Sequence, residues 1–193
     1  MRQILPLLLA MGLLSASAHG QTSEQPTLAA IQAIPIDSTT GQVHYSAVVL
    51  VPGVSKQELY TRAKAWALKM YNSPADVMRI ADADVGVVEC QGFADENVKV
   101  LGMGMKDRLY FTTRISVKEG RYKYEFSDLY FQSYPTNGTP DPPARTVEQY
   151  RKVSYSKTGK PYGGALNFMQ VFLARERILS ASIRQAMKGG DDW

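Results

Sequence analysis

Few side chains of this sequence could carry out chemistry. The chain has two histidines, and His19 lies in an N-terminal segment that has the features of a cleaved signal. A Ser–His–acid or Cys–His arrangement would therefore have to use His44. His44 stands at the start of a predicted strand, and the sequence contains no G-x-S-x-G nucleophile motif. We interpret His44 as a strand-face or surface histidine and expect a protein that is not an enzyme.

Cys90 is the only cysteine, so no disulfide can form within the chain. It shares a predicted strand face with Gly86 and Val88, which is typical of a small buried side chain rather than a reactive thiol. One cysteine and one histidine cannot build the usual zinc sites. Asp82-Ala83-Asp84 begins like a calcium loop but lacks the glycine and glutamate that should follow, so we interpret it as a turn. We expect neither a metal nor a cofactor.

Basic and aromatic residues on the later predicted strands form the best candidate site. Arginine and lysine beside aromatic rings can bind single-stranded nucleic acid, although aromatic residues on one strand face are more often core. We expect a glycan, a protein or a lipid head group as partner, and no nucleic acid. The candidate surface comprises Arg108, Arg114, Arg121, Lys123, Tyr122, Tyr124 and Tyr134, with Lys99, Lys106, Tyr130 and Phe131 nearby.

The N-terminus predicts export. Arg2 precedes the apolar run 4–14, and the small residues Ala16-Ser17-Ala18 follow it. The run is too short to span a bilayer. We expect a signal peptide over residues 1–20, cleaved near Ala18 or Gly20, and a periplasmic or secreted product. No cysteine follows the cleavage site, so this product would not be a lipoprotein.

The composition is that of one ordinary globular domain. The chain has 193 residues, of which 45% are hydrophobic and 21% are charged. Removal of the signal leaves about 170 residues, enough for one sizeable core. The formal net charge of +4 falls to about +3 without Arg2, too little to argue for nucleic acid on charge alone. We expect no membrane-spanning segment in the mature chain.

Turn-forming residues divide the chain into segments. We predict an N-terminal arm over 21–35, a single domain over 36–188 that includes a flexible loop at 132–145, and a tail over 189–193. The loop is rich in proline, glycine and asparagine. Its Asn137-Gly138-Thr139 matches a glycosylation sequon, which we interpret as a chance match.

The first half of the domain predicts a strand and then a helix. Residues 43–51 alternate as a strand, and the apolar Val48 and Leu50 suggest that its second half is covered on both faces. Ser55 and Glu58 match a capping box at the start of a helix. This helix would bury Trp66, and replacing Trp66 by alanine should then cost about 3–5 kcal/mol.

The remaining elements predict an antiparallel sheet and a long C-terminal helix. Gly120 suits a short hairpin loop, residues 147–160 are ambiguous, and a helix follows over about 165–188. The order strand, helix, strands, helix indicates an α+β fold in which helices cover one face of an antiparallel sheet. The later strands are predicted over 77–81, 85–91, 98–103, 109–117 and 121–131.

Several local strings, taken in order, resemble a bacterial family known only as domain of unknown function 4468. They are Val48–Gly53, Ser55–Tyr60 with Trp66, Gly120–Tyr124 and Tyr155–Pro161. The resemblance covers roughly residues 36–186. It implies a curved sheet like that of the TATA-binding protein and an exported product. It supplies no catalytic residues, and the fold name implies no DNA binding.

Two non-catalytic functions remain open, beside the less favoured alternative of an enzyme of unrecognised type. The first is a non-catalytic binding or interaction module of the bacterial envelope. The alternative is a carrier for a small hydrophobic, lipid-like ligand, held in a cavity between the sheet and the C-terminal helix. A pocket enclosed by the faces of the sheet would favour the carrier, and a fully packed core would exclude it. The residues that could line such a cavity are Tyr45, Tyr122, Tyr124, Phe126 and Phe172.

Overall fold

The structure is a computed structural model that describes residues 26–71, 77–134 and 143–189. A single antiparallel sheet runs through it in the order β1-β5-β4-β3-β2, and β6 pairs with the end of β5. The expected signal peptide lies outside the described residues, as do loop residues 135–142 and tail residues 190–193. The strands are β1 (Tyr45–Leu50), β2 (Met78–Asp82), β3 (Val87–Val100), β4 (Met103–Lys118), β5 (Arg121–Ser133) and β6 (Arg145–Thr146).

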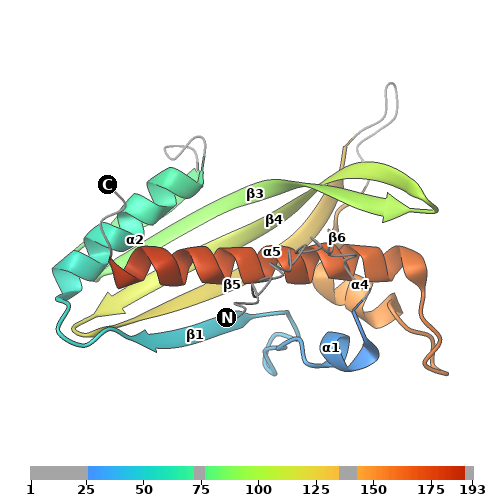
Figure 1. The fold of residues 1–193 in the computed structure, drawn as a ribbon, viewed down its shortest axis with the longest axis horizontal. Helices are drawn as coiled ribbons and strands as arrows, with labels where there is room; N and C mark the ends of the chain where they lie inside the picture. The colour runs from blue at the N-terminus through green and yellow to red at the C-terminus, as the bar shows by residue number, and fades with distance from the viewer. Residues whose placement is uncertain (1–25, 72–76, 135–142, 190–193) are drawn as a thin grey trace, which may run out of the picture.

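Three helices form a layer on one face of the sheet (Figure 1). The longest, α5 (Gly163–Lys188), runs along the sheet, with α2 (Lys56–Met70) and α4 (Val147–Val153) towards its two ends. The Trp66 indole N–H of α2 donates to Ser182 Oγ of α5 at 3.0 Å. The Tyr150 ring of α4 stacks on Phe168 of α5 at 4.2 Å. Among the helices of the described residues, none is long and apolar enough to cross a bilayer.

The core lies between this helix layer and the sheet. Alternate residues of each strand point towards the helices, because side chains alternate along a strand. Tyr45 of β1 meets Phe172 of α5 edge to face, with ring centroids 5.8 Å apart. The α+β fold expected from the sequence is therefore confirmed. The largest side chains buried in this layer include Ile115, Tyr122, Phe126, Phe131, Met169, Phe172 and Ile183.

Strands β3, β4 and β5 are longer than the sequence pattern predicted. A separate strand over 98–103 is wrong, because β3 continues to Val100 and β4 begins at Met103. Leu101 and Gly102 form the turn between them, with φ of 50° and 82°. The ambiguous stretch 147–160 contains α4, which begins at a complete capping box of Thr146 and Gln149. Of the expected loop, residues 132–133 belong to β5 and residue 145 to β6.

The expectation that β1 is covered on both faces is also wrong. Val48 is 63% exposed and Leu50 is 71% exposed, because both point away from the helix layer. Apolar side chains on both faces of a strand suggested double burial, but the second layer that this requires is not formed by the described residues. An aliphatic strip therefore stays exposed at the edge of the sheet.

Two N-terminal details differ from the expectation. Ser55 caps α2 through its side chain as predicted, but the Glu58 carboxylate pairs with Arg62 Nε at 2.8 Å instead of completing the box. The described part of the expected N-terminal arm contains a short helix, α1 (Leu28–Gln32). Ile31 and Ile34 of this segment are buried in the core, so the domain begins earlier than residue 36.

Replacing Trp66 by alanine should lower the free energy of unfolding by about 3–5 kcal/mol. The indole is 6% exposed, and the change would remove its packing together with its hydrogen bond to Ser182. Urea denaturation would measure the loss. Leu68→Ala is the matched control on the same helix, because Leu68 is 48% exposed. An equal loss in both variants would contradict the burial of Trp66.

Replacing Gly92 by alanine should lower the free energy of unfolding by about 1–3 kcal/mol. A Cβ atom at Gly92 would overlap the ring of Tyr71, whose hydroxyl donates to Thr113 Oγ1 at 3.3 Å. Gly104→Ala on the neighbouring strand is the control, since nothing lies within 4 Å of its Cβ position. Thermal unfolding of both variants would check this, and a neutral Gly92 variant would contradict it.

Candidate functional site

The face of the sheet opposite the helix layer, here called the open face, carries the polar residues that the sequence singled out. Arg108, Arg114 and Lys123 all lie on it. Tyr122 and Tyr124 do not, and their inclusion in the candidate surface is wrong. Both rings are buried against the helix layer, where the Tyr124 hydroxyl accepts a hydrogen bond from Arg184 at 2.8 Å. The side of β5 that carries these two aromatic rings is therefore part of the hydrophobic core.

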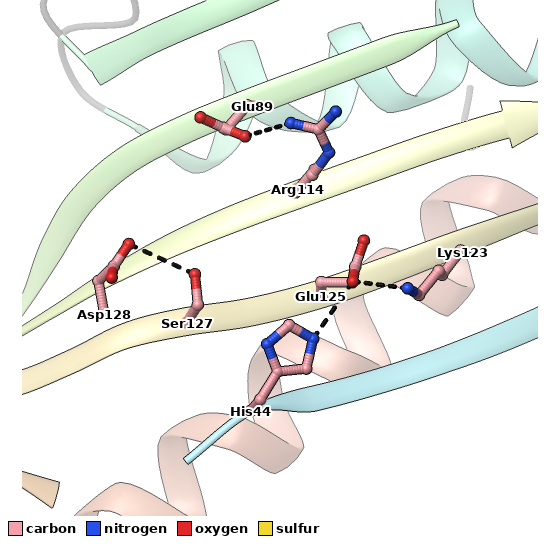
Figure 2. A network of polar contacts seen from close by, with 7 residues as sticks. All are labelled: His44, Glu89, Arg114, Lys123, Glu125, Ser127 and Asp128. Carbon is pink, nitrogen blue, oxygen red and sulfur yellow. Dashed lines mark hydrogen bonds and ion pairs between the residues drawn. The ribbon is translucent and has the colours of Figure 1, made fainter. Parts of the chain in front are cut away.

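A row of charges crosses the middle of the open face (Figure 2). Arg114 Nη1 of β4 pairs with Glu89 of β3 at 2.6 Å, and Arg114 lies opposite Glu125 in the register with β5. The same Glu125 oxygen meets Lys123 Nζ at 2.6 Å and His44 Nε2 at 3.2 Å. His44 is therefore part of a network of polar contacts that joins the strands. Arg121, the first residue of β5, is exposed.

Three aromatic rings form a ladder further along the same face, and of these the sequence pointed only to Tyr130. Phe93 of β3, Tyr110 of β4 and Tyr130 of β5 lie directly opposite one another in the register. Tyr110 and Tyr130 stack at 4.8 Å with an interplanar angle of 7°, and Phe93 is tilted against Tyr110 at 5.3 Å. Rings stacked at the strand spacing stand upright on the sheet, so they present ring edges outward.

Arg108 joins this ladder to Tyr134, and we call Phe93, Asp95, Arg108 and Tyr134 the Arg108 cluster. The guanidinium carbon lies 4.3 Å from the Phe93 ring centre and 4.5 Å from that of Tyr134. Its Nε reaches Asp95 at 3.2 Å and the Tyr134 hydroxyl at 2.9 Å. The Tyr134 hydroxyl in turn donates to Asp95 at 2.6 Å. Cation–π contacts and hydrogen bonds therefore hold this group in one arrangement.

The charge states of the cluster follow from these contacts. The hydrogen bond from Tyr134 lowers the pKa of Asp95, and the bond from Arg108 adds to this. The pKa of Arg108 is raised, first by a hydrogen bond with Tyr110 and then by hydrogen bonds with Tyr134 and Asp95. The pKa of Tyr134 is raised, first by its bond to Asp95. At neutral pH Asp95 is thus negatively charged and Arg108 positively charged. The two charges therefore compensate each other.

The described residues leave little space between the sheet and α5. The cavity between the sheet and α5 has a volume of about 10 Å³, room for about one water molecule. Its walls include Tyr45, Phe126 and Phe172, which the carrier hypothesis assigned to a ligand cavity. The space beside these three residues is therefore too small for a lipid-like ligand. A larger hollow of about 900 Å³ is an open groove on the far side of the helix layer, between α2 and α5.

The remaining candidates for chemistry are structural. Cys90 is buried, and burial raises the pKa of its thiol to about 11. Asp82 ends β2 just before the turn, and its carboxylate accepts the Val85 N–H at 2.8 Å. Within the described ranges, no three histidine, cysteine, aspartate or glutamate side chains come together as a group that could hold a metal ion.

Residues 45–132 match the model of the family described as "Domain of unknown function (DUF4468) with TBP-like fold". A DUF4468 family protein from Bacteroides ovatus ATCC 8483 superposes with a TM-score of 0.66 at 15% identity, covering 82% of this chain and 93% of that one. A TBP-like protein from Parabacteroides distasonis ATCC 8503 gives a TM-score of 0.63 at 20% identity, covering 82% and 99%. No curated protein matches. The resemblance expected from the sequence is confirmed, and these structures share the fold.

Cys90 should react slowly with thiol reagents while the protein is folded. Its side chain is buried, and at neutral pH a pKa of about 11 leaves almost no thiolate. Labelling with a chromogenic disulfide reagent, with and without denaturant, would measure this. The expected outcome is fast reaction only after unfolding. Stoichiometric labelling of the native protein within seconds would contradict the buried position.

Proposed function

We propose that this chain, whose residues 45–132 match DUF4468 and whose fold is TBP-like, is an exported, non-catalytic binding module of the bacterial envelope. The open face would contact its partner. The observation that carries this proposal is the Arg108 cluster, a set of aromatic and charged side chains held in a fixed arrangement on a face that the helices leave uncovered. Preorganised groups of this kind reduce the entropy lost on binding.

The charges of the open face suit a partner that is not a polyanion. Arg108, Arg114 and Lys123 each pair with a carboxylate of the same face. An anionic lipid head group or a nucleic acid would have to displace these carboxylates before the cations could bind phosphate. The tyrosine hydroxyls and the Asp95 carboxylate instead offer hydrogen bonds beside apolar ring edges. A glycan or a polar peptide segment fits this chemistry best.

The N-terminal sequence supports the location of this module. Arg2, the apolar run 4–14 and the small residues Ala16 and Ala18 have the order of a secretory signal. A domain with a single cysteine would reach the oxidising envelope without a disulfide of its own. Its stability would then rest on the continuous core between sheet and helices.

A photo-crosslinking amino acid placed at Phe93 should capture a discrete partner in cells of the source bacterium. Phe93 is 43% exposed and lies in the Arg108 cluster, so a bound partner would come within reach of the probe. The same probe at Ile178 is the matched control, because Ile178 is 54% exposed on α5, in the helix layer. Gel shifts and mass spectrometry of the products would identify the captured species.

Arg108→Ala in the Phe93 probe strain should weaken the crosslink, since Tyr134 and Asp95 lose the guanidinium that both contact. Crosslinks of equal yield from Phe93 and Ile178, or a product that Arg108→Ala leaves unchanged, would contradict binding through the open face. Recovery of the protein in the cytoplasmic fraction alone would contradict export.

A further inference from the structure

Two segments of the chain contain basic residues and no acidic ones. Residues 97–106 form the hairpin end of β3 and β4, and residues 149–175 run from α4 into the first half of α5. The two segments meet at the end of the molecule where α5 begins (Figure 1), and the Asn167 side-chain amide donates to the Lys99 carbonyl between them. We call these two segments the basic end. Its lysines are Lys99, Lys106, Lys152, Lys157 and Lys160.

The charges of these five lysines are not compensated within the described residues. All five are exposed, and none of them forms an ion pair with a carboxylate of the described part of the chain. The four acidic residues that border the two segments each accept a hydrogen bond from another group. The bonds are those of Glu96 with Arg175 Nε at 2.5 Å, Asp107 with the Ser133 hydroxyl at 2.9 Å, Glu148 with the Val43 N–H, and Glu176 with the Ser180 hydroxyl at 2.6 Å.

The hairpin of the basic end also presents apolar side chains to solvent. Leu101 is 92% exposed and Met103 is 67% exposed. Because side chains alternate along a strand, Met103 and Met105 share the side of the helix layer, whereas Lys99 and Lys106 point to the opposite side. The hairpin is thus amphipathic, with thioether groups on one side, ammonium groups on the other and a leucine at the tip.

The leucine at the tip occupies a position that does not suit its side chain. Val100 pairs with Met103, so Leu101 and Gly102 form a two-residue hairpin turn, with φ of 50° and 82°. Turns in which both residues have positive φ favour Asn-Gly, because a bulky residue is strained in the left-handed conformation. Here the strained residue is also large, apolar and exposed. Its side chain contributes little to folding, so the strain points to an interaction.

We propose that the basic end docks on the surface of a lipid bilayer that contains anionic phospholipids. Leu101 and Met103 enter the boundary between head groups and acyl chains, and the five lysines contact head-group phosphates. Lysines beside exposed apolar side chains are typical of proteins that lie on a membrane without crossing it. The exposed Tyr162, directly before α5, suits the same depth, because tyrosine is enriched at membrane interfaces.

The combination of charge and apolar surface favours a bilayer over other occupants. A nucleic acid would engage the lysines through its phosphates but would leave Leu101 and Met103 in water. A second copy of the chain could cover the apolar tip, but a two-fold contact would bring the lysines of both copies together. An anionic bilayer meets both requirements, because phosphate groups lie directly above acyl chains.

The chain enters the described domain at this same end. The hydroxyl of Tyr155, which lies between α4 and α5, donates to Pro26 O at 2.8 Å. The signal peptide predicted over residues 1–20 precedes Pro26 by only a few residues. A chain whose signal is held in a membrane would therefore have its basic end nearest to the lipid.

Docking by the basic end leaves the open face free for another partner. The cations in the middle of the open face pair with carboxylates of their own chain (Figure 2), whereas the lysines of the basic end do not pair with described carboxylates. The two surfaces thus differ in the partner that they suit. This inference does not depend on the proposed partner of the open face, and the crosslink from Phe93 tests that partner separately.

Flotation with vesicles would test the docking of the purified mature protein. The vesicles are of phosphatidylcholine, with or without phosphatidylglycerol as about a third of the lipid, and the protein should bind the anionic ones at least about tenfold more tightly. Added salt should weaken this binding. Leu101→Asn should weaken it about tenfold, because the apolar tip is lost. The same change should leave thermal stability equal or higher, because Asn-Gly suits the turn.

A charge reversal tests the lysines against a matched control. The double variant Lys157→Glu and Lys160→Glu should remove the preference for anionic vesicles. The control is Lys64→Glu with Lys69→Glu, which makes the same change in net charge at exposed positions of α2, towards the other end of α5 (Figure 1). The control variant should keep the preference, because its charges lie away from the basic end.

Several outcomes would overturn the proposal. They include no binding to the anionic vesicles, equal binding by the wild type and Leu101→Asn, and an equal loss of binding in the control and the Lys157 and Lys160 variant. Tighter binding to a single-stranded oligonucleotide than to the vesicles would assign the basic end to nucleic acid instead. Self-association without lipid that Leu101→Asn abolishes would assign the tip to a second copy.

Discussion

The packing of α5 across a single face of the sheet is the constraint on which the rest of the structure depends. Because one helix layer covers one face, the strands place most of their large apolar side chains on that side. Tyr122, Tyr124 and Phe126 are buried there against the helix layer, in which Phe172 and Met169 are also buried. The same constraint leaves the opposite face to the charged and amphipathic side chains. Core and open face are thus two results of one pattern of alternation.

A bulge in β5 keeps this pattern intact along the whole strand. Even-numbered residues point inward as far as Phe126, whereas Leu129 and Phe131 are the buried residues further along. The register shifts between Tyr110 and Thr112 of β4, where Asp128 of β5 adopts φ of 52°. The extra residue exchanges the two faces of the strand. Without it, Tyr130 would point into the core instead of stacking on Tyr110.

This bulge explains why the sequence revealed the fold better than the site. Local signals were sufficient for the capped helix after Ser55, the hairpin at Gly120 and the long C-terminal helix, because each depends on residues close together in the chain. Strict alternation placed Tyr122 and Tyr130 on the same face, and nothing in the sequence distinguishes Asp128 as a bulge residue. The Arg108 cluster depends on register across three strands. Asp95 and Tyr134 are 39 residues apart and meet only once that register is set.

Long β3 shows the same dependence on pairing. Residues 92–97 lack apolar alternation, yet β3 and β4 pair without interruption from Val87 to Val100. Pairing with β4 therefore imposes the extended conformation that the local sequence does not favour, and it carries Phe93 and Asp95 onto the open face. β1 is the opposite case. Its sequence has strong strand character, but among the described residues nothing covers Val48 and Leu50. Apolar side chains on both faces of a strand therefore do not show that both faces are buried.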